Sequence, residues 1–253
     1  MSTFLQLYGE ELSVELASSD TSILFTTARR KQAINDGMND FVRQTSCTKK
    51  YGSISLTDEV GEYDLYSLLT DYVRLDGDVW VSIYDGTDYR YLSGDDLPRR
   101  DPEELDFISP GWRAASVGTP NAWYLRENTG TLLLGLTPAP DIAATETWAA
   151  GVPYIANPTT MTADGNYPFT VGGAVILKLT PYHRALVHYA AAKLESLRKN
   201  YDGVTRQTQL YIGYVAQYLR QMRQEGGHTI QLARNYFQES QRGARPPDPT
   251  RWP

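Results

Sequence analysis

The residue types that most often bind metal ions or transfer protons are scarce in this chain of 253 residues. It has three histidines, His183, His188 and His228, and one cysteine, Cys47. His183 and His188 are five residues apart, whereas two ligands on one helical face are three or four apart. No second cysteine is available for a structural zinc site. We therefore predict surface or interface histidines, a small apolar role for Cys47 near a helix end, and no bound metal.

The acidic residues do not form a pattern that indicates catalysis. They occur in adjacent pairs, such as Glu10–Glu11 and Glu103–Glu104, whose side chains point in different directions from a helix. A glycoside hydrolase needs two carboxyl groups that face each other across a sugar. Asp76-Gly77-Asp78 lacks the later ligands of a calcium loop, and Gly172-Gly173 lacks the lysine of a phosphate loop. We predict no catalytic residue, no cofactor and no enzymatic activity.

The C-terminal residues 226–253 have the chemistry of a binding segment. Four prolines follow Arg245, and the segment is too polar to form a core of its own. Aromatic and guanidinium side chains contribute most to binding at protein interfaces. We predict an extended arm that orders against a partner through a few anchors: Tyr236, Phe237, Arg242, Arg245, Arg251 and Trp252. A disordered end is the alternative interpretation.

Composition limits the class of protein. Hydrophobic residues make up 41% and charged residues 21% of the chain, as in an ordinary folded domain. The formal net charge of −6 argues against nonspecific nucleic-acid binding by the chain as a whole. No stretch approaches the roughly 20 apolar residues of a membrane span, and the acidic N-terminus does not resemble a signal peptide. The 18 tyrosines suit interfaces and strands equally.

The spacing of hydrophobic residues differs between parts of the chain. Helical spacing predicts helices over about 21–46, 181–199 and 204–224, with Asp20 or Thr21 capping the first and Pro181 opening the second. We expect Gly37 in the first helix to let a neighbour approach closely. Alternation predicts strands within about 51–150, including a meander through residues 72–92. Residues 151–173, rich in Gly, Pro, Asn and Thr, predict a long loop.

These elements predict an α+β protein. The expected fold is an antiparallel helical bundle with a β-rich insertion and an extended C-terminal arm. Its parts are an N-terminal segment with the first bundle helix, the insertion, a helical hairpin that completes the bundle, and the arm. Their predicted bounds are residues 1–50, 51–173, 174–225 and 226–253.

Over roughly residues 20–225, the order of these features resembles the head-to-tail adaptor proteins of tailed bacteriophages. Five stretches carry the resemblance: Ala28-Arg29, Ile34 to Met38 with Phe41, Tyr63-Asp64-Leu65, Gly118 to Tyr124 with Leu136 to Pro140, and Leu179 to Ala191.

The resemblance implies a structural virion protein at the neck, assembled in the host cytoplasm. It implies a dodecameric ring beneath the portal protein, an arm that reaches the portal, and a nozzle or tail-tube protein docked below. Double-stranded DNA would pass through the ring without specific binding. Two alternatives stay open: a phage-associated peptidoglycan hydrolase, and a DNA packaging or ejection factor.

Overall fold

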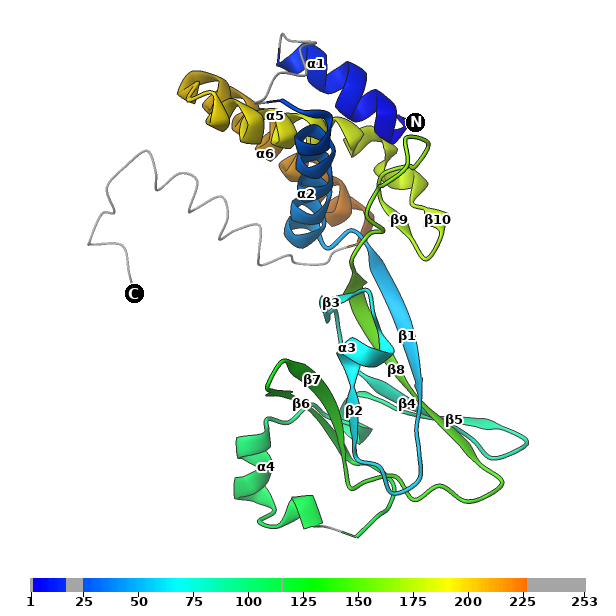
Figure 1. The fold of residues 1–253 in the computed structure, drawn as a ribbon. Coiled ribbons are helices and arrows are strands. Elements are labelled where there is room, and N and C mark those ends of the chain that lie inside the picture. Colours follow the sequence, from blue (N-terminus) through cyan, green and yellow to red (C-terminus); the bar gives the residue numbers. More distant parts are fainter. Residues whose placement is uncertain (1, 17–24, 115, 227–253) are drawn as a thin grey trace. The chain divides into compact units, whose positions relative to one another are not determined.

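The structure is a computed structural model that describes residues 2–16, 25–114 and 116–226 (Figure 1). The chain divides into two compact units. The helical unit comprises Met1–Thr48 and Pro158–Pro253, and the strand unit comprises Lys49–Asn157. The chain therefore leaves the helical unit once, builds the strand unit, and returns. The α+β class predicted from the sequence is confirmed.

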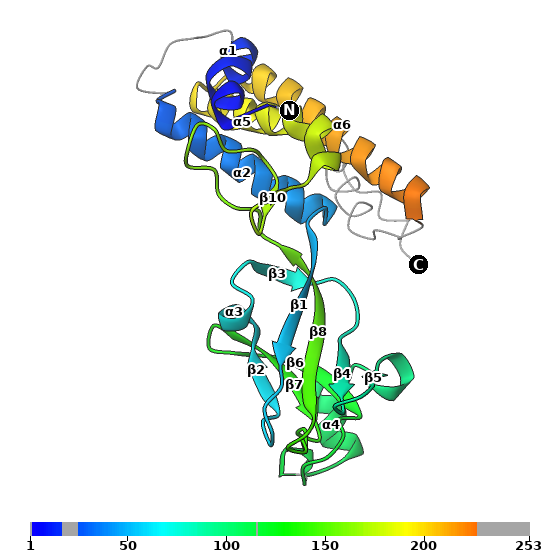
Figure 2. The ribbon, with the colours of Figure 1, turned by 90° about the vertical axis from the view of Figure 1, so that its right-hand side faces the viewer.

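Long helices pack together in the helical unit, where α5 contacts both α2 and α6 (Figure 2). Gly37 of α2 lies against Tyr189 of α5, where an added Cβ would come 3.1 Å from Tyr189 Cδ1, so the expected close approach is confirmed. The described elements of this unit are η1 (Gln6–Glu11), α1 (Leu12–Glu15), α2 (Thr27–Thr45), β9 (Thr170–Val171), β10 (Ala174–Val175), η4 (Leu177–Tyr182), α5 (His183–Leu197) and α6 (Tyr201–Gly226).

Capping groups correct the predicted helix starts. Helix α2 begins at Thr27 because the Thr26 side chain accepts a hydrogen bond from the Arg29 N–H; the predicted caps, Asp20 and Thr21, lie outside the described residues. Pro181 lies inside the 3-10 helix η4, so α5 begins only at His183. Helix α6 begins before Val204, since the Asn200 side chain accepts from the Gly203 N–H at 3.2 Å.

The N-terminal helix, η1 followed by α1, was not predicted from the sequence. Its signal was present nevertheless, because Phe4, Tyr8, Leu12 and Leu16 follow one another at intervals of four residues. All four side chains are buried in the helical unit. The acidic residues among them, which argued against a signal peptide, obscured this apolar stripe.

The strand unit contains two antiparallel sheets. The larger has the order β1-β8-β4-β5, with β3 also paired to β8, and the smaller has the order β2-β7-β6. The elements are β1 (Lys49–Ser55), β2 (Glu62–Asp64), α3 (Leu65–Leu68), β3 (Tyr72–Leu75), β4 (Trp80–Tyr84), β5 (Tyr89–Leu92), η2 (Gly94–Asp96), α4 (Pro102–Ile108), η3 (Trp112–Ala114), β6 (Ala122–Asn128), β7 (Thr131–Thr137) and β8 (Thr147–Ala156).

The pairing of β8 overturns two predictions. Residues 151–156, predicted as the start of a long loop, form the second half of β8, the strand that pairs with β1, β3 and β4. Gly151 and Pro153 suggested a loop, but Gly151 lies beneath the Trp80 indole, where only glycine fits. The predicted meander is also wrong, because β3 pairs with β8 and leaves β4 to pair with β5 and β8.

The segment 158–173, expected in the β-rich insertion, contacts α2 instead. The Asn35 side chain exchanges two hydrogen bonds with the Met161 backbone, each at 3.0 Å. The buried Phe169 ring lies 5.4 Å from the Phe41 ring, between centroids. Both contacts lie within the helical unit, so the chain has already returned to that unit at Pro158.

Candidate interaction surfaces

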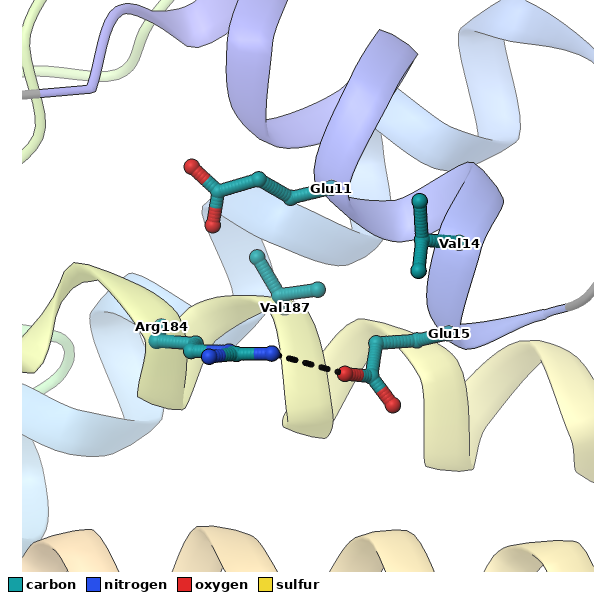
Figure 3. A pocket seen from close by; sticks show the side chains of 5 residues that line it. All are labelled: Glu11, Val14, Glu15, Arg184 and Val187. Carbon is teal, nitrogen blue, oxygen red and sulfur yellow. Dashed lines mark hydrogen bonds and ion pairs between the residues drawn. The ribbon is translucent and has the colours of Figure 1, made fainter.

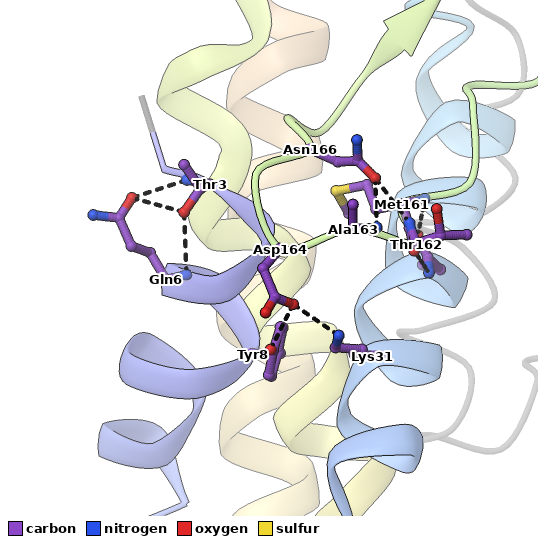
Figure 4. Close-up of polar contacts among 10 residues, drawn as sticks. Thr3, Gln6, Tyr8, Lys31, Met161, Thr162, Ala163, Asp164 and Asn166 are labelled. Atoms are coloured by element: carbon purple, nitrogen blue, oxygen red, sulfur yellow. Dashed lines mark hydrogen bonds and ion pairs between the residues drawn. The ribbon is translucent and has the colours of Figure 1, made fainter.

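One carboxylate, that of Asp164, is among the groups that hold the N-terminal helix to the rest of the helical unit. Asp164 accepts hydrogen bonds from Tyr8 Oη and Lys31 Nζ, both at 2.8 Å (Figure 4). Hydrogen bonds from Lys31 and Tyr8 hold the pKa of the Asp164 carboxyl below its ordinary value. The Phe4 N–H also donates to the Asn166 carbonyl at 2.8 Å. The segment 158–173 thus joins the N-terminal helix to α2.

A chain of polar side chains links α1, α5 and α6. Gln207 Nε2 donates to Glu15 Oε2 at 3.0 Å, and the other end of this amide, Oε1, lies 2.7 Å from His188 Nδ1. This orientation of the amide requires the imidazole proton on Nδ1. Burial opposes ionisation of Glu15, but the Gln207 hydrogen bond and the charges of His188 and Arg184 outweigh it and lower its pKa.

A shallow hollow of about 290 Å³ opens between α1 and α5, beside the hydrogen-bonded side chains of Glu15, Gln207 and His188 (Figure 3). Arg184 Nη2 lies 3.4 Å from Glu15 Oε1 at one edge of the hollow. Val14 is exposed there, while Val187 is buried at the base. The lining pairs an apolar floor with one ion pair, which suits a protein side chain better than a polar small molecule. The lining residues are Glu11, Val14, Glu15, Arg184 and Val187.

A second groove of about 350 Å³ lies where α2, α5 and α6 meet. Tyr211 Oη donates to Asp40 Oδ2 at 2.5 Å, and Lys193 Nζ donates to Asp36 Oδ2, also at 2.5 Å. The Tyr189 and Tyr211 rings stand edge to face, with their centroids 5.3 Å apart. Two of its polar lining residues, Lys193 and Tyr211, are thus paired with carboxylates of α2.

In the strand unit, Tyr124 covers the small sheet. An added Cβ at Gly135 would come 1.9 Å from Tyr124 Cζ, so the ring lies directly on the β7 backbone. Tyr124 Oη donates to Glu62 Oε1 at 2.8 Å, and Arg126 Nη2 donates to Glu62 Oε2 at 2.7 Å. Burial and the neighbouring Glu62 carboxylate raise the pKa of the Tyr124 phenol. These residues line a pocket of about 540 Å³ that Trp112 borders.

The prediction of surface or interface histidines is wrong for His183 and His188, because both are buried inside the helical unit. Removal from water lowers the pKa of His183 to about 4, which keeps the ring neutral. His188 is buried by its contacts with Gln207 and the Tyr214 ring. Cys47, also buried, has its thiol pKa raised to about 12 by burial, so it is not a ready nucleophile. His228 lies outside the described residues.

No group of three or more His, Cys, Asp or Glu side chains that could hold a metal ion occurs within residues 2–16, 25–114 and 116–226. In the same part of the chain, no helix has the length and apolar character to cross a membrane. The grooves described above are lined by paired polar groups and apolar side chains.

The six predicted anchors of the arm lie outside the described residues, which end at Gly226 in α6. They are Tyr236, Phe237, Arg242, Arg245, Arg251 and Trp252.

Comparison with known proteins gives one family. The family model described as SU10 adaptor protein matches residues 2–242, nearly the whole chain. The match includes both units, the N-terminal helix and the first part of the segment beyond α6. No curated protein matches the chain.

Proposed function

Because the chain belongs to the SU10 adaptor protein family, and is therefore a phage adaptor protein and virion component, we propose that it is the head-to-tail adaptor of a tailed bacteriophage. In this proposal a dodecameric ring of the protein sits beneath the portal, joins it to a nozzle or tail-tube protein and lines the DNA channel. The observation that carries the proposal is the family match over residues 2–242.

The proposed contact with the portal is the arm, residues 226–253. Fixing a free chain costs about 1–2 kcal/mol of backbone entropy per residue, so the arm needs a large preformed surface. Pro246, Pro247 and Pro249 lower this cost by restricting the free chain. In the proposal, Arg242, Arg245 and Arg251 pair with acidic residues of the portal. Tyr236, Phe237 and Trp252 fill apolar pockets there.

The distribution of charge supports passage of DNA without retention. Lys49–Asn157, the strand unit, contains 18 acidic and 8 basic residues, a net charge of −10, against −6 for the whole chain. A surface with this excess of carboxylates repels the phosphate backbone instead of holding it. The remainder of the chain carries the compensating positive charge, which the proposal assigns to contacts with other virion proteins.

The proposed organisation keeps a helical bundle at its centre. Support comes from α5, which packs on both α2 and α6, and from the short connection between α5 and α6, which ends at the Asn200 cap. We propose bundle, insertion and arm as the functional parts, with the N-terminal helix added to the bundle. The insertion was predicted to span residues 51–173. In this proposal it ends just after β8, because residues 158–173 belong to the helical part.

The deciding experiment mixes the purified protein with purified portal rings and examines the mixture by electron microscopy. The proposal expects a monomer or weak oligomer alone, and an additional ring of density on one end of each portal in the mixture. Portals that stay bare at saturating protein would overturn it. If isolated subunits bound to the portal without closing into a ring, the proposed ring would be wrong, whereas the proposed docking on the portal would stand.

A further inference from the structure

Aromatic side chains of the five-stranded sheet gather on one of its faces. Residues opposite one another in the register share a face: Trp80 lies opposite Gly151, Tyr84 opposite Tyr89, and Ser82 opposite Tyr91. Tyr51 of β1 joins this face, with its ring centroid 5.8 Å from that of Trp80. We call Tyr51, Trp80, Tyr84, Tyr89 and Tyr91 the aromatic face.

The aromatic face is open to solvent. The exposed fractions are 74% for Tyr51, 64% for Tyr89 and 58% for Tyr91. The Trp80 indole lies flat on the sheet, because three of its ring atoms come within 2.4 Å of the position that a Cβ of Gly151 would take. Its other side is therefore turned away from the backbone. Exposed aromatic rings are the surface that proline-rich segments in the extended polyproline II conformation recognise.

One end of the aromatic face is acidic. Asp85 and Asp88 lie in the exposed turn that joins β4 to β5, next to Tyr84 and Tyr89. Hydrogen bonds from the Asp88 N–H and from the N–H and hydroxyl of Thr87 end at Asp85 Oδ1 and lower the pKa of this carboxyl to about 2, so it is ionised. None of these bonds uses Oδ2. A carboxylate beside tyrosine rings is a favourable position for a guanidinium group.

The basic residues that the register places on this face lie at its other end. Lys49 and Arg74 are both opposite Ile155 of β8. Thr147, which is opposite Tyr84, lies eight residues away along β8, a distance of about 26 Å. A cationic partner is therefore drawn to the turn between β4 and β5, at the acidic end of the face.

The chain contains one segment with matching chemistry. Residues 245–252 read Arg-Pro-Pro-Asp-Pro-Thr-Arg-Trp, and we call them the proline segment; they lie outside the described residues. Polyproline II has three residues per turn, so Pro246, Pro249 and Trp252 would share one side of it. Residues 227–253 contain four arginines and two acidic residues, whereas the strand unit has a net charge of −10.

We propose that, in the free protein, the proline segment docks on the aromatic face of its own chain. Pro246, Pro249 and Trp252 lie against the rings, and an arginine of the segment pairs with Asp85 and Asp88. Charge favours this occupant over others. A DNA duplex or a second strand unit is repelled by a unit of charge −10, whereas the positively charged arm is attracted to it.

The lengths of the segment and the face agree. In polyproline II, Pro246 to Trp252 spans about 19 Å. The face extends about 13 Å along β4 from Trp80 to Tyr84, and β1 with Tyr51 lies two strand spacings from β4, about 10 Å. The tether between Gly226 and the proline segment is long enough, because its 19 residues reach up to about 65 Å. A unit of 100 residues has a radius of gyration of only about 13 Å, so the segment can reach the face for any arrangement of the two units.

This docking adds a regulatory step, and that step rests on the proposed function. The proposed portal contact uses Arg245, Arg251 and Trp252, which are also part of the proline segment. The arm cannot bind the portal and the aromatic face at the same time. The free protein therefore keeps its anchors folded back on its own chain, and a portal ring releases them by competing for the arm.

The test is a crosslink within one chain of the free, full-length protein. The variant Ser53→Cys/Thr250→Cys places one thiol on the aromatic face, where Ser53 is opposite Gly151, and one in the proline segment; the native Cys47 is buried. A short bismaleimide at submicromolar protein should join positions 53 and 250 within a monomer, as read by peptide mass spectrometry. The control Ser109→Cys/Thr250→Cys uses an exposed serine after α4, outside the aromatic face, and should give at least tenfold less of the link. Equal yields from the two variants, or links only between different chains, would overturn the proposal.

Substitutions on either side of the contact supply a second readout. Adding Tyr89→Ser/Tyr91→Ser, Asp88→Lys or Pro246→Gly/Pro249→Gly to the crosslinking variant should each lower the yield at least fivefold, while circular dichroism shows an unchanged fold. Tyr201→Ser, which alters a tyrosine of the helical unit that is 73% exposed, should leave the yield unchanged. Yields that none of the three changes lowers would contradict the docking.

Portal rings separate this docking from the proposed function. Adding them should lower the crosslink yield at least fivefold, because the portal takes the same anchors. A link that forms in the free protein and persists on portal-bound protein would overturn the release step alone. Absence of the link from the free protein would overturn the docking, whereas attachment to the portal would stand.

Discussion

Gly151 lies directly beneath the indole of Trp80, where an added Cβ would come 2.0 Å from Trp80 Cε2. The two residues face each other across the pairing of β8 with β4. The tryptophan ring therefore rests on backbone, and its position depends on the missing side chain of Gly151. This contact explains why a glycine occupies a strand that pairs on both of its edges.

Gly151→Ala should destabilise the protein by about 1–3 kcal/mol, because the added methyl group must displace Trp80 or the β4 backbone. Urea unfolding followed by fluorescence measures the effect. Gly213→Ala is the matched control, since a Cβ there meets nothing within 4 Å and alanine favours α6. A loss of stability in the control that equals the loss in Gly151→Ala would contradict the explanation.

Asp71→Asn should destabilise the strand unit by about 1–3 kcal/mol at neutral pH, since Asp71 accepts from Lys50 and the buried Tyr154. Burial opposes ionisation of Asp71, but these two hydrogen bonds outweigh it and lower its pKa below 3.8. Its contribution is thus complete at neutral pH and is lost as pH falls below the unfolded-state pKa. The difference between wild type and variant should shrink in acid. Asp78→Asn, on the exposed turn, should cost little.

His183→Leu should remove part of the acid sensitivity of the fold. The folded-state pKa of His183 is about 4, below the ordinary 6.5, so the unfolded chain binds this proton first as pH falls. Stability is therefore complete above pH 6.5 and decreases towards pH 4, by up to about 3 kcal/mol. Urea unfolding across this range should give a flatter profile for the variant. Identical slopes for both proteins would contradict a buried, neutral imidazole.

Deleting residues 227–253 should leave the fold intact and abolish attachment to portals. The deletion keeps all of α6, which ends at Gly226. Sedimentation with portal rings measures attachment, and circular dichroism checks the fold. Full-length protein with Trp252→Ala and Arg251→Ala should show intermediate attachment, as expected when two anchors are removed. Normal attachment by the truncated protein would rule out the arm as the portal contact.

The free protein should not bind duplex DNA tightly near physiological salt, because the carboxylates of the strand unit repel phosphates. A fluorescence anisotropy titration with a labelled duplex should show no saturation at micromolar protein. Binding in the nanomolar range would favour a DNA packaging or ejection factor over a passive channel.

The sequence by itself determined the class and the order of the parts. The amphipathic stripe with Ile34, Met38 and Phe41 predicted α2, although α2 begins at Thr27, six residues later than predicted. Alternation around Val79, Val81 and Ile83 predicted β4 to within one residue of its observed bounds. These patterns are local: each element must turn its own apolar residues to one side, whatever it packs against. The family resemblance rested on the same features in order, and the family match agrees with it.

The tertiary structure alone decided what lies inside and which strands pair. Glycine and proline in residues 151–156 predict a loop when only the local sequence is considered. In the structure these residues belong to the central strand β8, because Trp80, about 70 residues earlier in the sequence, covers Gly151. The burial of His183 and His188 likewise depends on Phe169 and on Gln207 and Tyr214, none of which their own helix contains. The spacing of apolar residues shows which face of a segment can be buried. It does not show which other segment buries that face, because this depends on contacts between segments far apart in the chain.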